Sequence, residues 1–329
     1  MAEYINIRGQ SIEVVASDPA NPTIGQIWYN STSNTLKGEA YADGTWATGG
    51  NLGTARGASG SAGTQTAALG FGGYVPGVTN ATEEYNGSSW SAGGNLGTAR
   101  YSLAGAGTQT AALAIGGNPY TPPISKVSTE EYNGATWSPG GNLGTGRQAL
   151  GGCGTQTSAL AFGGLVPPQT GATEEYNGST WTSNPTGLNT ARSNLGGTGT
   201  QTAGLAFGGS SPSLTGATEE YDGTSWTSNP TGLNTARLRV KGAGTQTAAL
   251  AFGGEAPPGK QAATEEYDGS TWTSNPTGLN TARAATGQAG TQTAALAFGG
   301  DVGGVPFTTG ATEEWTGAGA PTTKTVTVS

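Results

Sequence analysis

Adjacent glutamate pairs occur six times in this sequence of 329 residues, and paired carboxylates are the groups that glycosidases use for acid–base chemistry. The pairs begin at Glu83, Glu130, Glu174, Glu219, Glu265 and Glu313. Each lies in a Thr-Glu-Glu-Tyr or Thr-Glu-Glu-Trp stretch that predicts a β-strand. Neighbouring residues of a strand point to opposite faces, so one pair does not converge on one substrate. The pattern and its repetition favour a structural role over acid–base catalysis.

Arginine also recurs once per repeat. The positions are Arg56, Arg100, Arg147, Arg192, Arg237 and Arg283. We expect an arginine of one blade to meet a glutamate of a neighbouring blade in a partly buried, charge-assisted hydrogen bond. The alternative is a ring of charge at the mouth of a central channel, where it binds an ion or a ligand. We assign these arginines to contacts between blades.

Other residue types that carry catalysis or bind metals are scarce. The chain has no histidine, which removes the commonest general base and metal ligand. Its one cysteine, Cys153, forms no disulfide within the chain, and small residues stand at its place in the other repeats, so we expect a small-residue role. No glycine-rich loop follows a strand and opens a helix. We predict a non-enzymatic protein without catalytic residues, cofactor or metal site.

The composition also argues against several partners. The formal net charge is -8 and no basic residues cluster, so nucleic-acid binding is not expected. Residues 1–20 contain no apolar run of the signal-peptide type, and no stretch approaches the length of a membrane span. We therefore predict no membrane insertion and synthesis in the cytoplasm without a signal peptide.

The frame that must position these residues is a repeat of about 45 residues. Its clearest stretch, 244–254, reads Gly-Thr-Gln-Thr-Ala-Ala-Leu-Ala-Phe-Gly-Gly. The six copies begin at Gly63, Gly107, Gly154, Gly199, Gly244 and Gly290. Four short strands are expected per unit, which in the fifth unit are 238–243, 248–254, 263–267 and 270–273. The Gly-Thr-Gln-Thr stretch and Asp268-Gly269 are turns between them.

Four-stranded units of this length indicate an all-β fold with the blades of a β-propeller. A β-solenoid is the alternative, but the unit is long for one coil. Tryptophans mark the expected fourth strand, and we assign them to the gaps between blades: Trp46, Trp90, Trp137, Trp181, Trp226 and Trp272. The glutamine of each Gly-Thr-Gln-Thr turn is expected to line the axis in a functionally silent polar ring.

The repeat boundaries predict six blades and a ring closed by an N-terminal strand. The units lie near 52–98, 99–145, 146–190, 191–235, 236–281 and 282–317, with 42–51 completing the last blade. Closure of this kind removes open sheet edges. Residues 35–41 compete with 312–315 as the third strand of the last blade. We therefore assign 1–33 to a β attachment segment, 34–317 to the propeller and 318–329 to a C-terminal strand, which we expect to pair with the N-terminal segment.

Three features of the repeat resemble the kelch repeat. They are the glycine pair after the second strand, the tyrosine five residues before a tryptophan, and the arginine before the next unit. In the fifth unit the glycine pair is Gly253 and Gly254, and the aromatic pair is Tyr267 and Trp272. The resemblance covers 35–317 and implies a propeller in which the double glycine ends the second strand. The inner strands here use Ala and Gly where kelch units use Val and Ile, which marks a divergent relative.

A second resemblance is closer. The near-identical repeat arrays, together with a Gly-Gln-Ile-Trp-Tyr-Asn-Ser stretch at 25–31, look like tail-fibre or virion-surface proteins of marine phages, including cyanophages. The resemblance spans almost the whole chain. It implies a location in the virion.

The loops between the second and third strands differ among units, unlike the turns. They span 74–80, 118–128, 165–171, 210–216, 255–262 and 301–310. We expect them on the same face as the links between blades. Variable loops on a rigid frame are typical of recognition surfaces, while drift and assembly contacts are the alternatives. Candidate contacts with a receptor or partner are Tyr74, Val75, Asn118, Tyr120, Lys126, Leu165, Gln169, Ser211, Lys260, Asp301 and Phe307.

These observations favour a phage virion structural protein, a tail-fibre or receptor-binding propeller that contacts a host cell-surface glycan or protein. The alternative is a purely structural decoration or assembly subunit of capsid or tail. A third hypothesis is a carbohydrate-active enzyme that uses a glutamate pair. We expect the N-terminal segment to bind other virion proteins, and the protein to be a homo-oligomer in the virion.

Overall fold

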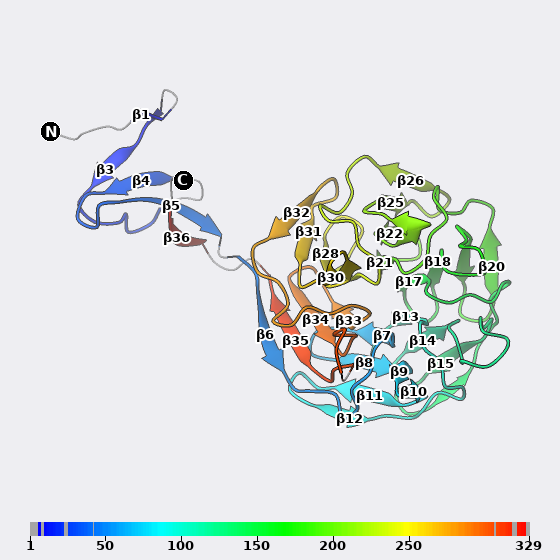
Figure 1. Cartoon of the computed structure of the whole chain (residues 1–329). Helices are drawn as coiled ribbons and strands as arrows, with labels where there is room; N and C mark the ends of the chain where they lie inside the picture. The colour runs from blue at the N-terminus through cyan, green and yellow to red at the C-terminus, as the bar shows by residue number, and fades with distance from the viewer. Residues whose placement is uncertain are drawn as a thin grey trace. The chain divides into compact units, whose positions relative to one another are not determined.

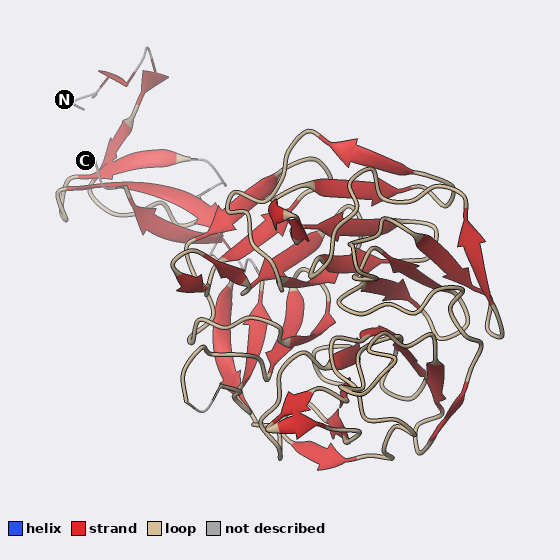
Figure 2. Cartoon of the chain, turned by 45° about the vertical axis from the view of Figure 1, so that its right-hand side comes forward, coloured by secondary structure: helices blue, strands red, loops and turns tan. Residues whose placement is uncertain are grey.

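A computed structural model describes residues 6–7, 10–22, 26–41, 43–305, 307–317 and 321–326. Contacts divide the chain into two units. Residues 45–316 form the larger unit, and the segments on either side of them form the smaller one. Figure 2 shows strands joined by loops, and no helix, in the described residues. The all-β prediction is confirmed.

The larger unit is a six-bladed β-propeller. Its described residues form six four-stranded antiparallel sheets, seen as the blades in Figure 1. From the inner strand outward, blade 1 is β7 (Gly60–Gly63), β8 (Ala68–Phe71), β11 (Thr82–Tyr85) and β12 (Trp90–Ala92); blade 2 is β13 (Ala104–Gly107), β14 (Ala112–Ile115), β15 (Thr129–Tyr132) and β16 (Trp137–Pro139); blade 3 is β17 (Gly151–Gly154), β18 (Ala159–Phe162), β19 (Thr173–Tyr176) and β20 (Trp181–Asn184).

The remaining blades follow the same order. Blade 4 is β21 (Gly196–Gly199), β22 (Gly204–Phe207), β25 (Thr218–Tyr221) and β26 (Trp226–Asn229); blade 5 is β27 (Lys241–Gly244), β28 (Ala249–Phe252), β31 (Thr264–Tyr267) and β32 (Trp272–Asn275); blade 6 is β33 (Gly287–Gly290), β34 (Ala294–Phe298), β35 (Thr312–Thr316) and β6 (Thr45–Gly49). Consecutive inner strands contact one another around the axis, and β33 contacts β7, so the ring is closed.

The closure by an N-terminal strand is confirmed. Strand β6 pairs antiparallel with β35, and Trp46 lies opposite Trp315. The competing segment, β5 (Thr35–Tyr41), pairs instead with β4 (Ile27–Asn30) and β36 (Pro321–Thr325). Residues 34–44, which we assigned to the propeller, therefore belong to the smaller unit. They cannot serve as a third strand because residues 312–316 already occupy that place.

The predicted glycine pair and the predicted Asp-Gly turn both lie between strands of the fifth unit. The glycine pair after β28 has φ values of 61° at Gly253 and 106° at Gly254, in the left-handed region that side chains disfavour. A Cβ on Gly253 would lie 2.6 Å from the carbonyl oxygen of Arg283. At the outer hairpin, Asp268 Oδ1 accepts the main-chain N–H groups of Ser270 and Thr271. The first strand begins later than predicted, at Lys241, because Arg239 has a φ of 53° and breaks the extended chain.

Tryptophans fill the gaps between blades, as predicted. Each indole Nε1 of the outer strand donates to a threonine hydroxyl on the third strand of the preceding blade, at 2.8–3.0 Å. The bonds join Trp46 to Thr264, Trp90 to Thr312, Trp137 to Thr82, Trp181 to Thr129, Trp226 to Thr173 and Trp272 to Thr218. Five of the rings also pack on the phenylalanine of that blade's second strand, as Trp137 does on Phe71. Blade 2, which precedes the blade of Trp181, has Ile115 at that place.

The first glutamate of each pair bonds an arginine, but not across blades as expected. The pairs are Arg56–Glu83, Arg100–Glu130, Arg147–Glu174, Arg192–Glu219, Arg237–Glu265 and Arg283–Glu313. Both partners belong to the same unit, because the arginine lies in the link that enters the blade and reaches that blade's third strand. The arginine side chains are fully buried rather than partly buried. The second carboxylate oxygen accepts a link N–H, as Glu174 does from Gly144 at 2.7 Å.

In five of the six pairs, the second glutamate joins neighbouring blades through a tyrosine, a bond that was not predicted. The sixth, Glu266, accepts a hydrogen bond from Asn275 instead, because blade 6 has Trp315 at the tyrosine's place. The hydroxyls of Tyr85, Tyr132, Tyr176, Tyr221 and Tyr267 donate to Glu314, Glu84, Glu131, Glu175 and Glu220. Burial and these bonds raise the pKa of the first three tyrosines to about 12. The two carboxylates of a pair thus face opposite sides of the strand, as predicted.

The turn glutamines do not line the axis, contrary to our prediction. Each lies over the seam between blades and donates through Nε2 to two main-chain carbonyls of the preceding blade. Gln156, for example, bonds the carbonyls of Ala112 at 3.1 Å and Tyr132 at 2.6 Å. The other five, Gln65, Gln109, Gln201, Gln246 and Gln292, do the same.

The variable loops share a face with the links between blades, as predicted. Each loop starts with an antiparallel bridge to the link before the inner strand. The bridges are Gly57–Tyr74, Tyr101–Asn118, Gln148–Leu165, Ser193–Ser210, Leu238–Glu255 and Ala284–Asp301. Three loops also form small hairpins, β9 (Tyr74–Val75) with β10 (Gly77–Val78), β23 (Ser210–Ser211) with β24 (Ser213–Leu214), and β29 (Glu255–Ala256) with β30 (Gly259–Lys260).

The smaller unit is a sheet of four strands in the order β3-β4-β5-β36 among the described residues, with β3 (Glu13–Val15) parallel to β4. A short hairpin of β1 (Asn6–Ile7) and β2 (Gln10–Ser11) precedes it. Asp18 accepts bonds from Lys37, Asn30 and Trp28, which lower its pKa to about 2. The C-terminal strand was expected to pair with residues 1–33, but β36 pairs with β5, which we assigned to the propeller and which belongs to the same sheet as β3 and β4. Residues 318–320 and 327–329 lie outside the described part of the chain.

Candidate ligand-binding site

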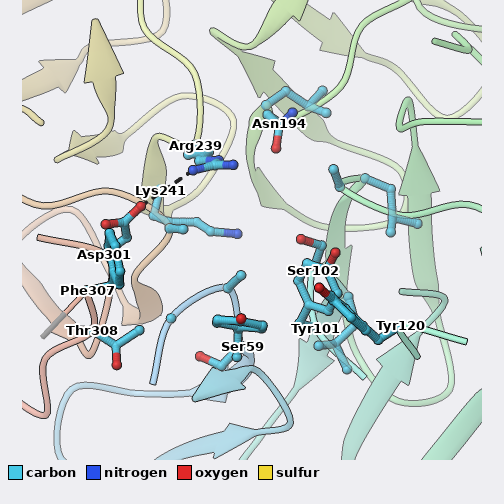
Figure 3. A pocket seen from close by; sticks show the side chains of 18 residues that line it. Ser59, Tyr101, Ser102, Tyr120, Asn194, Arg239, Lys241, Asp301, Phe307 and Thr308 are labelled. Carbon is cyan, nitrogen blue, oxygen red and sulfur yellow. Dashed lines mark ion pairs between the residues drawn. The ribbon is translucent and has the colours of Figure 1, made fainter. Parts of the chain in front are cut away.

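A cavity of about 370 Å³ lies on the propeller axis at the variable-loop face (Figure 3). Residues from all six links line it, and loop residues of three blades extend its wall. The volume falls at the lower end of the range for small-molecule sites. Because every blade contributes, the site exists only in the closed ring.

A ring of six main-chain hydrogen bonds frames this cavity. The residue two positions before each inner strand donates its N–H to the carbonyl of the equivalent residue in the preceding unit, at 2.7–3.0 Å. The members are Ala58, Ser102, Ala149, Asn194, Arg239 and Ala285, with φ values from 52° to 56°. A positive φ is costly for residues with a Cβ, and the closed ring of bonds holds it in place. We call this feature the main-chain ring; it points all six side chains at the cavity.

Arg239 and Lys241 depart from the repeat at this site. Arg239 is the charged member of the main-chain ring, where the other units have Ala, Ser or Asn. Lys241 is the first residue of β27, and the same place in the other inner strands holds Gly60, Ala104, Gly151, Gly196 or Gly287. Figure 3 shows the Lys241 side chain extending into the middle of the cavity.

The ammonium group of Lys241 is a poorly solvated charge. Burial, with no counter-ion contributing among the described residues, lowers the pKa of Lys241 to about 8. Beneath Lys241, the channel narrows to a neck of about 20 Å³ that Lys241 itself lines. Such a space admits about one water molecule, so little solvent reaches the lysine from below.

Gln288 closes the channel at this neck. Its Oε1 accepts the N–H of Gly242 at 2.7 Å, and its Nε2 donates to the carbonyl of Gly197 at 3.1 Å. The side chain therefore crosses the axis from blade 6 to blades 5 and 4. The equivalent places hold Ser61, Gly105, Gly152, Gly197 and Gly242. Gln288 is thus the polar floor of the axial cavity.

An acidic pair at the cavity edge is neutralised by neighbouring cations. Asp301 lies 2.9 Å from Lys260 Nζ and 3.6 Å from Arg239 Nη1. Glu255 lies 2.8 Å from Lys260 and 3.5 Å from Arg239. Two acids thus face two cations, and Lys241 remains as an additional positive charge. The electrostatic balance at this end of the channel is positive, although the whole chain is acidic.

Three tyrosines form an aromatic cluster on the cavity wall. Tyr74 and Tyr120 come from the loops of blades 1 and 2, and Tyr101 comes from the link between them. Their ring centroids lie 5.8, 6.4 and 6.5 Å apart. Figure 3 shows Tyr101 and Tyr120 across the cavity from Asp301 and Phe307. Burial and the neighbouring tyrosines raise the pKa of Tyr101, so its hydroxyl stays neutral.

The structure brings four of the predicted loop residues to the cavity: Tyr74, Tyr120, Asp301 and Phe307. Lys260 lies next to it through its pair with Asp301. The others do not line it: Val75, Asn118, Lys126, Leu165, Gln169 and Ser211. Asn118 is buried and donates to Gln148 Oε1 at 2.8 Å, so it supports its loop. Cys153 is buried and free, in keeping with a small-residue role, and burial raises its pKa to about 12.

Sequence reasoning missed Tyr101, Arg239 and Lys241. These residues lie in the links or at the start of an inner strand rather than in the variable loops, and the links reach the axis. A comparison of the six units shows the signal: large or charged residues at Arg239, Lys241 and Gln288 replace residues that are small in most other units.

The described residues offer neither a metal-binding cluster nor a membrane-spanning helix. They contain no cluster of three or more Cys, Asp or Glu side chains placed to hold a metal ion. No helix in this part of the chain is long and apolar enough to cross a membrane.

Comparison of the sequence with known protein families and with curated proteins found no match. The six-bladed propeller and its axial cavity are therefore the features on which a function can be argued.

Proposed function

We propose that this protein is a non-enzymatic receptor-binding propeller of a phage virion, and that the axial cavity at its variable-loop face holds a host-surface saccharide. The observation that carries the proposal is the tyrosine cluster on the wall of a cavity of about 370 Å³. Tyrosine presents an apolar face with a polar tip, which suits the mixed apolar and hydroxylated surface of a sugar ring.

The distribution of variation supports a binding role for this face. The repeated parts of each unit hold the frame through the Arg–Glu, Tyr–Glu and Trp–Thr bonds. Parts that differ between units, namely the links and the loops of blades 1, 2 and 6, line the cavity. Exposed Tyr120 and Phe307, at 66% and 65% of their full exposure, are apolar groups held at its mouth. Exposed aromatic side chains beside a pocket favour ligand contact over neutral drift.

The virion assignment has a separate basis. The repeat arrays and the stretch at 25–31 resemble virion-surface proteins of marine phages, and the units resemble kelch repeats. We propose that the smaller unit binds other virion proteins and that the virion holds several copies. The second candidate, a decoration subunit without a receptor, uses the same frame but needs no tyrosine cluster.

Binding of purified protein to an array of marine bacterial surface polysaccharides tests the proposal. We expect the Tyr74→Ala/Tyr120→Ala double variant to bind at least about tenfold more weakly, equivalent to about 1.4 kcal/mol. Thr182→Ala, on an exposed outer strand, is the matched control. The virion assignment needs its own measurement, labelling of phage particles with an antibody against residues 45–316.

Two results would count against the receptor role. One is the absence of any polysaccharide signal at millimolar concentration. The other is undiminished phage adsorption when the double variant replaces the natural protein. Either result, with antibody labelling of the particle, would favour the decoration subunit.

A further inference from the structure

We infer that the axial cavity selects an acidic saccharide, whose carboxylate or sulfate group binds the ammonium of Lys241 with Arg239 beside it. This inference rests on the proposed saccharide-binding role of the cavity and adds the chemical class of the sugar.

Cationic side chains gather around the axial cavity. Outside the six arginines bonded to glutamates, residues 45–316 contain four cationic side chains: Lys126, Arg239, Lys241 and Lys260. Arg239 and Lys241 line the cavity, and Lys260 pairs with Asp301 in its wall. A chain with a formal net charge of -8 thus places three of these four cations around one cavity. Such an arrangement attracts an anion and repels cationic ligands.

Lys241 lacks a carboxylate partner among the described residues. A charge in a confined place is normally paired, because desolvation is otherwise uncompensated. Lys260 supplies the short contacts to Glu255 and Asp301, whereas the contacts of Arg239 with them are 3.5 and 3.6 Å long. No described residue forms an ion pair with Lys241, and burial lowers its pKa. An anionic group of the ligand would complete this site.

The cavity combines aromatic, cationic and amide side chains. The tyrosine cluster offers stacking faces on one wall, Lys241 offers a charge in the middle, and Gln288 bounds the floor. The cavity size suits one or two sugar rings better than a folded protein segment. A pyranose with an acidic substituent uses both the aromatic and the cationic parts, whereas a neutral sugar leaves Lys241 unpaired.

Three probes of similar length test the inference by calorimetry: oligogalacturonate, its methyl ester, and a sulfated galactan oligosaccharide. The methyl ester removes the charge and keeps the sugar. We expect oligogalacturonate or the sulfated probe to bind at least about tenfold more tightly than the methyl ester. Which acidic probe binds separates a carboxylate ligand from a sulfate ligand.

Two substitutions restore the residue of the sibling units and so keep the frame. Lys241→Gly matches Gly60, Gly151, Gly196 and Gly287, and Arg239→Ala matches Ala58, Ala149 and Ala285 in the main-chain ring. Lys241→Gly should abolish the preference for the acidic probe, and Arg239→Ala should reduce it. Lys241→Met provides a second neutral variant if the glycine variant folds poorly. Lys126→Ala, a loop cation away from the cavity, should change nothing.

The outcomes separate the two proposals. Equal binding of oligogalacturonate and its methyl ester, weakened by the Tyr74→Ala/Tyr120→Ala variant, would overturn the acidic ligand but leave saccharide binding standing. An acidic preference that survives Lys241→Gly and Lys241→Met would overturn the inference as well. Failure of every probe and of the polysaccharide array would overturn both.

Discussion

The two ends of the axial channel are surrounded by the same six units, yet they differ in chemistry. The loop-face end carries Arg239, Lys241 and the tyrosine cluster. The other end is a shallow hollow of about 200 Å³ lined by glycine and alanine with Ser61, Cys153, Thr198 and Gln288, and without a charged side chain. The difference teaches that this propeller concentrates chemical variety where links and loops meet, while the described lining of the other end of the channel carries no charge.

The two ends also differ in how their surroundings are held. At the turn face, the glutamines such as Gln156 bond main-chain carbonyls of the neighbouring blade and repeat in every unit. At the loop face, the main-chain ring fixes the backbone and leaves the side chains free to differ. A backbone ring is insensitive to side-chain identity, which explains how Ala, Ser, Asn and Arg occupy equivalent places. The predictions below test this division between frame and site.

The largest effect is expected from breaking the frame. Arg147→Met removes one partner of a buried ion pair, 2.8 Å from Glu174, and leaves a buried charge unpaired. We expect a loss of about 3–5 kcal/mol in the free energy of unfolding, measured in urea, with both ends of the channel disturbed. Arg239→Ala is the matched control, since that side chain is 43% exposed and should cost less than about 0.5 kcal/mol. Equal free energies of unfolding for the two variants would contradict the division between frame and site.

Ligand affinity at the loop-face end should depend on pH through Lys241. The free protein holds the pKa of Lys241 at about 8, so the ammonium is present below that value and is lost as pH rises through it. A bound anion raises that pKa, and affinity should fall about tenfold per pH unit above 8 until the pKa of the bound state is reached. The other charged or titratable groups at the cavity and its edge are Arg239, Lys260, Glu255, Asp301 and the three tyrosines.

Calorimetry with oligogalacturonate between pH 7 and 10 measures this dependence. Lys241→Met should give a flat profile at lower affinity. A steep profile in that variant would assign the titration to another group. The free energy of unfolding should change with pH in the opposite direction to the affinity. Burial of the ammonium is unfavourable, so the unliganded protein should gain stability as pH rises from 8 to 10.5, relative to Lys241→Met.

A smaller effect is expected at the turn face. Gln156→Ala removes two hydrogen bonds to the preceding blade and should cost about 1–2 kcal/mol of unfolding free energy. Saccharide affinity should stay unchanged, because the glutamine lies at the opposite end of the blade. Thermal unfolding and calorimetry on one preparation provide both values. A change in affinity would show that the two ends are coupled.

The smallest effect is expected on the pKa of Lys241, when the floor between the two ends is opened. Gln288→Gly restores the residue of blades 2 to 5 and removes the side chain that closes the neck. Water would then reach Lys241 from below, and its pKa should rise by about one unit, equivalent to about 1.4 kcal/mol of solvation. NMR titration of the labelled lysine measures the shift. An unchanged pKa would locate the burial of Lys241 in the side walls of the cavity.

Much of the frame was predictable because it is repeated. The glycine pair Gly253-Gly254 ends a strand through its backbone angles alone, and the place of Trp46 in the last blade follows from counting units. The partners of Arg147 and Gln156 were not predictable. Both side chains are long enough to reach either their own blade or its neighbour, and only the packed ring decides which carbonyl or carboxylate is in range.

The sequence by itself determined the number of blades, the closing strand and the opposite directions of the two glutamates in each pair. These follow from period, spacing and the alternation of a strand, which are local properties of the chain. The tertiary structure alone decided that Tyr74, Tyr101, Arg239 and Lys241 surround one cavity. They come from three units, separated by up to 167 residues (241 minus 74), and only closure of the ring brings them to a common axis. For that reason the candidate site is a property of the assembled propeller and of no single repeat.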